Sequence, residues 1–205
     1  KVFNDANITI NCHCNGDEAS EVFIDAIAKA LATHPWKDNR HTIQHGQMID
    51  TPQFMKMKKL GMCANLFTNH IYYWGDQHVE KTIGEKARTM DAAGTALVLG
   101  IQFSLHCDAS VTPIAPLFNA WSAVNRVTAS GKVLGEDLKI TVEDALYAMT
   151  MGSAYLLRLE NELGSITVGK IADMVVLEKD PYAIDPMELK DIRVMATVLG
   201  GEITT

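Results

Sequence analysis

The sequence lacks long apolar stretches and clustered positive charge. No apolar run reaches about 18 residues, the length that a membrane-spanning helix requires, so we expect no membrane span. Lys and Arg number 18 against 25 Asp and Glu, which gives a formal net charge of -7. No basic stripe is present, and nucleic acids and anionic membranes both attract clustered cations. We therefore expect neither a nucleic acid nor a membrane as a partner.

Cysteine is also scarce. Four cysteines lie in or beside apolar segments with strand character, namely Cys12, Cys14, Cys63 and Cys107. Their number and spacing do not match a small disulfide-bonded scaffold, so we interpret them as reduced thiols and expect a cytoplasmic protein. The Cys12-His13-Cys14 run lacks the C-x-x-C spacing of structural zinc sites, which disfavours a cysteine-rich zinc centre.

Strand and helix patterns alternate along the first part of the chain. Strands are predicted at 8–13, 41–45, 61–67 and 101–108, and helices at 18–33, 51–60 and 80–99, with a long loop over 68–78. Such an order predicts an α/β fold with a parallel sheet and right-handed crossovers. With 47% hydrophobic residues, the chain can bury a substantial core.

The pattern changes after the fourth strand. Helices are predicted at 116–128 and 142–157, followed by a turn-rich stretch, a strand at 174–177 and a hairpin with strands at 194–199 and 202–204. We therefore divide the chain into an α/β part, residues 1–160, and a small β segment, residues 161–205.

The stretch 101–110 runs an apolar strand directly into a carboxylate. Side chains alternate along a strand, so Ser104, His106 and Asp108 are expected on one face, opposite Phe103, Leu105 and Cys107. In a soluble β/α barrel the polar set points inward, and the residue at the C-terminal end of the strand opens onto the active-site mouth. Asp108 is thus a candidate catalytic residue, and the alternative is that it only caps the next helix.

Two histidines occupy positions equivalent to that of Asp108. His13 and His45 also stand at the C-terminal ends of predicted parallel strands, and these ends meet at one edge of a sheet. Imidazole and carboxylate are the usual ligands of a catalytic zinc with an open water position. The three residues together predict a metal site, although a single strand histidine is more often an ordinary rim or core residue.

Several motifs resemble the amidohydrolase superfamily of metal-dependent hydrolases, in particular the amidohydrolase-3 branch with the N-substituted formamide deformylases. The motifs are His13-Cys-Asn-Gly-Asp17, His45-Gly-Gln47, His106-Cys-Asp108-Ala and the tail from Gly164 to Leu177 with Asp180-Pro181. The resemblance covers nearly the whole chain. It implies the C-terminal half of a (β/α)8 TIM barrel, strands five to eight, followed by part of a small β-sandwich domain.

The resemblance also implies roles for individual residues. His13, His45 and Asp108 would bind a divalent metal, most simply zinc, with one or two ions in the full-length parent. Asp108 would also act as general base toward a metal-activated water that attacks a carbon-nitrogen bond of a small amide or formamide. A deaminase of the same superfamily is an alternative.

Four further residues are candidates for substrate binding. His70, Tyr73 and Trp74 fall in the long predicted loop, where lids and substrate contacts are common, although each could instead be a solvated or docking residue. His106 lies one layer deeper than Asp108 and could orient it or simply fill the barrel floor.

The sequence contains no H-x-H pair, which the family carries on its first strand. It also begins at Lys1 without an initiator Met, as expected for a piece of a longer polypeptide, and a preceding signal peptide stays open. Half a barrel exposes two strand edges, so we expect homo-oligomers. The rival hypothesis is a catalytically incompetent barrel fragment that acts only as an oligomerising or binding module.

Overall fold

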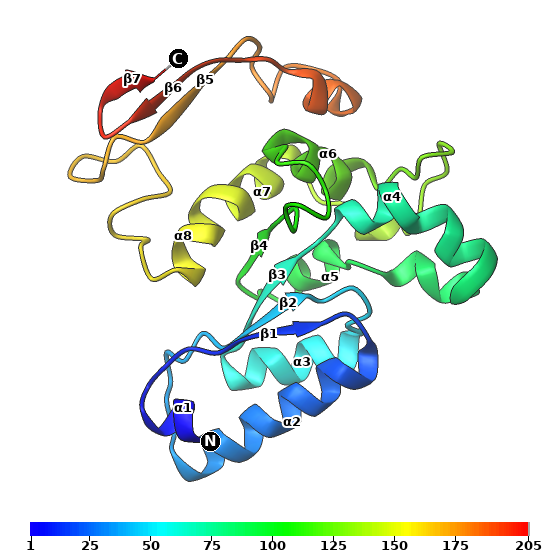
Figure 1. Cartoon of the computed structure of the whole chain (residues 1–205), viewed down its shortest axis with the longest axis vertical. Helices are drawn as coiled ribbons and strands as arrows, with labels where there is room; N and C mark the ends of the chain where they lie inside the picture. Colours follow the sequence, from blue (N-terminus) through cyan, green and yellow to red (C-terminus); the bar gives the residue numbers. More distant parts are fainter. Residues whose placement is uncertain (205) are drawn as a thin grey trace.

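A four-stranded parallel sheet forms the centre of the protein in our computed structural model, which describes residues 1–204 (Figure 1). Its strands are β1 (Asn11–Cys14), β2 (Thr42–His45), β3 (Cys63–Leu66) and β4 (Phe103–Leu105), and they pair in the order β1-β2-β3-β4. All three pairings are parallel, so all four C-terminal ends meet at one edge of the sheet. The predicted α/β fold with a parallel sheet is confirmed.

Helices connect these strands and follow them. They are α1 (Val2–Asp5), α2 (Asp17–Thr33), α3 (Thr51–Leu60), α4 (Asn69–Gln77), α5 (Ala93–Val98), α6 (Pro116–Asn125), α7 (Val142–Tyr147) and α8 (Ser153–Leu156). Helices α2 and α3 lie side by side beneath the β1 and β2 end of the sheet in Figure 1. Their buried residues Ile24, Ile27, Phe54 and Met57 join the main apolar core with Ile43 and Leu66 of the sheet. Burial of this apolar face fixes which side of the sheet is covered.

The segment 68–78 is not the predicted loop, because α4 occupies most of it. This helix buries Asn69, His70, Ile71 and Gly75. A Cβ atom at Gly75 would approach Thr128 and Leu134 to 2.8 and 2.9 Å, so the glycine allows close packing and does not mark a loop.

The prediction of one continuous helix over 80–99 is also wrong, because the structure has three separate helical segments in this region. They are a π-helical turn, η1 (His78–Thr82), a 3-10 helix, η2 (Gly84–Thr89), and the short α5. Gly84 and Asp91 have φ angles of +57° and +49°, which no continuous right-handed helix can contain. A second π-helical turn, η4 (Ala148–Gly152), likewise separates α7 from α8.

A second, antiparallel sheet follows the α/β part. It contains β5 (Met174–Leu177), β6 (Val194–Leu199) and β7 (Glu202–Thr204), with the predicted hairpin between the last two strands. Before this hairpin, the 3-10 helix η5 (Pro186–Asp191) packs on α6, where the indole of Trp121 donates to the carbonyl of Met187 at 3.0 Å. A further 3-10 turn, η3 (Glu136–Leu138), follows α6.

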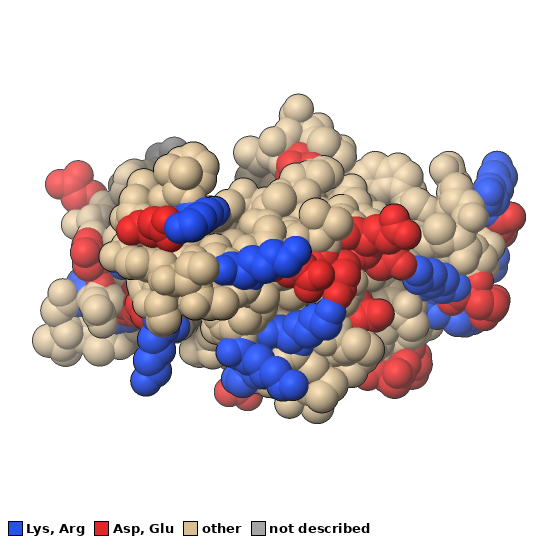
Figure 2. All heavy atoms as spheres, turned by 90° about the horizontal axis from the view of Figure 1, so that it is seen from below, with Lys and Arg blue, Asp and Glu red and all other residues tan. Residues whose placement is uncertain are grey.

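The surface carries charges of both signs. Acidic and basic side chains are interspersed over the face drawn in Figure 2. Among the described residues, 1–204, no helix combines the length and apolar character needed to cross a membrane.

Candidate metal centre

A pocket of about 280 Å³ lies where the parallel strands end. Its lining comes from the C-terminal ends of β1 and β2, from the residues that follow β1 to β4, from α4 and from the start of η1. These residues are His13, Asn15, His45, Gln47, Phe67, His70, Trp74, His78, Asp108 and Val111. Because the C-terminal ends of parallel strands converge, residues nearly a hundred positions apart in the sequence share this pocket.

His13 and His45 lie in direct contact at the pocket. Their ring centroids are 4.4 Å apart, with the rings nearly perpendicular. In the strand register His45 faces Cys14, and His13 faces Gln44, so regular alternation would put the two rings on opposite faces. His45 has a φ of +72°, however, and leaves the strand geometry at this point. The unusual backbone conformation accompanies the convergence of the two rings.

The imidazole of His45 is buried and incompletely hydrogen-bonded. Its Nδ1 has no partner among the described residues. Burial, followed by the neighbouring His13, lowers the pKa of His45, so the neutral ring with an available lone pair is favoured. A neutral imidazole with a free ring nitrogen can coordinate a metal ion.

Asp108 lines the same pocket from beyond the end of β4. The strand is shorter than predicted and ends at Leu105, and Asp108 has a φ of +48° in the turn that follows. The helix-capping alternative is wrong, because α6 starts after Ala115 and lacks a side-chain cap. The charge of Asp108 acts on both His45 and His106, where it opposes the lowering of their pKa by burial.

The side chains in this pocket are of the types that coordinate divalent cations. Two imidazoles and a carboxylate share one pocket, and one imidazole nitrogen lacks any other partner. Within residues 1–204, however, no three His, Cys, Asp or Glu side chains already surround a common point. A metal held here would take its first ligands from His13 and His45.

The predicted substrate-binding residues divide into two groups. His70 and Trp74 line the pocket, and their rings are 5.6 Å apart. Tyr73 is outside this lining and packs against Tyr72, Trp74 and Phe118 instead. His106 packs on His45 at 4.9 Å beneath the lining, and burial lowers its pKa to about 4.

A row of polar residues across the sheet was recognised only in part by sequence reasoning, which placed Ser104 on the inward face of its strand. Gln44, Asn65 and Ser104 occupy one row across β2, β3 and β4, linked by hydrogen bonds of 2.6 and 2.7 Å. Gln44 also donates to Asn11 of β1 at 2.9 Å. Alternation places this row on the sheet face opposite the one that carries Ile43, Leu66 and Leu105. Polar residues at equivalent strand positions were the signal available in the sequence.

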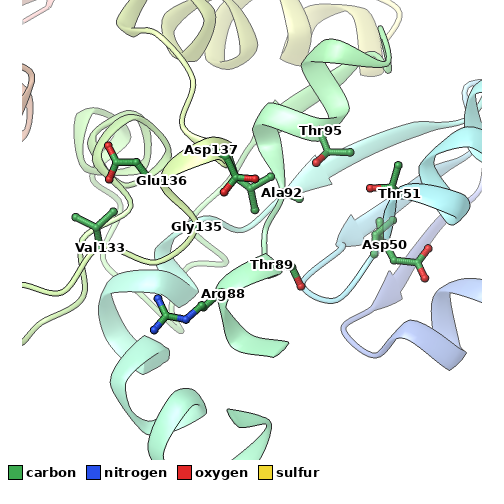
Figure 3. Close-up of a pocket in the computed structure, with 12 residues that line it drawn as sticks. Asp50, Thr51, Arg88, Thr89, Ala92, Thr95, Val133, Gly135, Glu136 and Asp137 are labelled. Carbon is green, nitrogen blue, oxygen red and sulfur yellow. The ribbon is translucent and has the colours of Figure 1, made fainter. Parts of the chain in front are cut away.

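A separate hollow of about 490 Å³ lies between the start of α3, η2, α5 and η3 (Figure 3). Its lining contains the carboxylates of Asp50, Glu136 and Asp137 and the guanidinium of Arg88, without histidine or cysteine. It shares no residue with the histidine pocket and contributes no ligand to it.

Comparison with known proteins agrees with this architecture. YtcJ of Bacillus subtilis, named as an amidohydrolase, is 30% identical over 195 residues, covering 93% of this chain and 36% of that protein. The N-substituted formamide deformylase of Arthrobacter pascens is 26% identical over 95% of this chain and 36% of its own length. The crystal structure of an uncharacterized metal-dependent hydrolase from Pyrococcus horikoshii superimposes with a TM-score of 0.74 at 22% identity, over 89% of this chain and 36% of that one.

The chain therefore spans about a third of the length of these relatives. The sequence model of the amidohydrolase family nevertheless matches the whole chain, residues 1–205. The match includes every strand that contributes to the histidine pocket, and it confirms the resemblance read from the motifs. The chain belongs to the amidohydrolase family.

Proposed function

We propose that the parallel sheet is the C-terminal half of a (β/α)8 barrel, with β1 to β4 as strands five to eight. Residues 161–205 would form part of a small β-sandwich domain. Three observations support this assignment: the order of the four parallel strands, the polar row on one face of their sheet, and the coverage of about a third of longer relatives. A barrel encloses such a row, while an isolated half leaves it open to solvent.

The complete polypeptide would hydrolyse a carbon-nitrogen bond of a small amide or formamide. The observation that carries this proposal is the convergence of His13, His45 and Asp108 on one pocket. His13, His45 and Asp108 would hold a divalent cation, with zinc first because its usual ligands are imidazole and carboxylate. When bound, such a cation supplies Lewis acidity and lowers the pKa of water.

The protein side chains would then move the proton and orient the substrate. Asp108 would accept a proton from the attacking water and return it to the leaving nitrogen, so that water adds to the carbonyl carbon and the carbon-nitrogen bond breaks. Trp74 and Phe67 form an aromatic wall of the pocket that would exclude bulk water from the reacting groups.

The test uses the complete polypeptide with Asp108→Asn and, as a matched control, the same substitution outside the pocket, Asp76→Asn. Loss of a general base costs about 10²- to 10⁴-fold, so kcat on N-acyl and N-formyl amines should fall by that factor in Asp108→Asn only. Metal content by plasma mass spectrometry gives an independent readout. Turnover of Asp108→Asn close to that of the unaltered protein would rule out the assigned role.

A non-catalytic role is the second candidate. It is favoured by the lack of a preassembled group of three ligands within residues 1–204 and by the free edges of β1 and β4. The chain would then act as an oligomerising module, and a homo-oligomer seen by light scattering without bound metal would support it. A deaminase would be recognised by ammonia release from an amine-bearing ring.

A further inference from the structure

A buried carboxylate stands directly behind the histidine pocket. Asp91, between η2 and α5, is fully buried, and its Oδ1 lies 3.1 Å from Nδ1 of His70. Its Oδ2 has no hydrogen-bond partner among the described residues. His70 in turn lines the pocket, so the carboxylate of Asp91 reaches the site through this ring.

The surrounding structure holds Asp91 rigidly. Its backbone N–H donates to the carbonyl of Gln47 at 2.8 Å, in the segment that leads from His45 to α3. Its φ of +49° turns the chain between η2 and α5. Both constraints fix the carboxylate at the base of His70 independently of the His70 contact.

A buried cation compensates the charge of this carboxylate. Arg126 is fully buried and donates to the carbonyls of Leu134, Asp91 and Met90 at 2.6, 2.8 and 2.7 Å. Burial raises the pKa of Asp91 above its ordinary value, and the charges of His70 and Arg126 oppose this rise. The guanidinium shifts the balance toward the ionised form of Asp91, and this form can only accept hydrogen bonds.

The contact between Asp91 Oδ1 and His70 Nδ1 determines which nitrogen of His70 carries the proton. An accepting carboxylate requires a donor, so Nδ1 of His70 keeps its proton, and in this tautomer Nε2 presents a lone pair. Nε2 forms no hydrogen bond within residues 1–204 and is not among the atoms buried without a partner. It is thus available on the pocket side of the ring.

We infer that Asp91 is a positioning residue that holds His70 with its Nε2 lone pair toward the pocket, where it accepts a hydrogen bond from the N–H of a secondary amide substrate. This inference rests on the proposed hydrolase function and names a substrate class within it. Amides with a nitrogen-bound hydrogen would be preferred over tertiary amides, which have no proton to donate.

The first experiment needs neither metal nor activity. Two-bond ¹H–¹⁵N correlation spectra of the complete, metal-free polypeptide report the tautomer of each histidine. We expect His70 protonated at Nδ1, and in Asp91→Asn a shift toward protonation at Nε2, because the amide NH₂ can donate to Nδ1. Asp76→Asn, on the same helix as His70 but bound to Thr128 and Ser130, is the control and should leave the spectrum of His70 unchanged.

The second experiment compares N-butylformamide with N,N-dibutylformamide. One hydrogen bond changes selectivity by roughly threefold to tenfold, so the ratio of their kcat/KM values should fall by that factor in Asp91→Asn and in His70→Phe. The effect should appear in KM more than in kcat, and Asp76→Asn should retain the ratio. His70→Phe keeps an aromatic ring against Phe67 and Trp74 and serves if Asp91→Asn does not fold.

Three outcomes would overturn the inference. They are a His70 protonated at Nε2 in the unaltered protein, an unchanged selectivity ratio in both variants, and a loss of zinc affinity in His70→Phe as large as in a His45 variant. The last would make His70 a metal ligand, a role that a carboxylate-bound histidine can also take. Failure of the hydrolase proposal is recognised separately, since no formamide would be cleaved while the tautomer remains measurable.

Discussion

Two buried histidines lie at opposite ends of β2 and differ in the hydrogen-bond partners of their ring nitrogens. His41, just before the strand, is fully buried, and both of its ring nitrogens have partners. Its Nδ1 accepts from the N–H of Ile10 at 3.0 Å, and its Nε2 lies 3.1 Å from Oδ1 of Asn4. His45, four positions later, leaves Nδ1 without a partner and adopts a positive φ.

The comparison separates a structural histidine from a candidate functional one. Burial lowers the pKa of both rings, so neutrality alone does not distinguish them. The distinction lies in what the lone pair contacts, because a satisfied nitrogen stabilises the fold while an unsatisfied buried nitrogen costs free energy unless a ligand engages it. The end of β2 with unsatisfied polar groups is the end that forms the pocket.

The largest difference is expected in metal affinity. His45→Gln should weaken zinc binding by more than about 100-fold, because even the outer partners of metal ligands typically contribute about 10- to 100-fold. His41→Gln should leave the affinity within about threefold, since its nitrogens are already engaged at the other end of the strand. Competition with a chromophoric chelator at pH 7.5 measures both. Equal losses in the two variants would remove the distinction drawn between the two histidines.

The second difference concerns the dependence of stability on pH. Burial lowers the pKa of His41 to about 4 from an ordinary value of 6.5. As pH falls below 6.5, the unfolded chain binds a proton at this position while the folded chain does not, so the free energy of unfolding decreases until about pH 4. The full loss from this ring is at most about 3 kcal/mol.

Urea denaturation of the metal-free protein between pH 7.5 and pH 4 tests this. His41→Gln should flatten the decline, because the variant has no proton to gain at this position and its amide can still accept from Ile10. Thr141→Ala, which removes the N-cap of α7, should lower stability without altering the decline. An unchanged slope in His41→Gln would contradict the assignment.

Local sequence patterns predict only part of this arrangement. Four short apolar runs between loop signals were sufficient to predict the parallel sheet. The positions of His13, His45 and Asp108 at predicted strand ends were sufficient to predict that they share one pocket. Asp91 was not found, because a charged residue within an amphipathic pattern is normally interpreted as exposed. Its burial depends on Arg126, 35 positions later, and on Gln47, far earlier, and such contacts leave no local periodicity.

The smallest effect is expected at the cap of α3, just beyond the pocket end of β2. Asp50, directly before the helix, is its N-cap. Its Oδ1 accepts from the N–H of Gln53 at 2.8 Å, and the Gln53 side chain accepts from the N–H of Asp50 at 3.1 Å.

Removal of this capping box should cost about 1 kcal/mol in Asp50→Ala, while Asp50→Asn, which retains an accepting oxygen, should lose less. Zinc affinity should be unchanged in both, because Asp50 lines the other hollow and not the histidine pocket. Chemical denaturation paired with the chelator titration provides both values. Loss of zinc affinity in Asp50→Ala would mean that the loop from His45 to α3 depends on the cap, so the pocket end of β2 could not be treated as independent of helix stability.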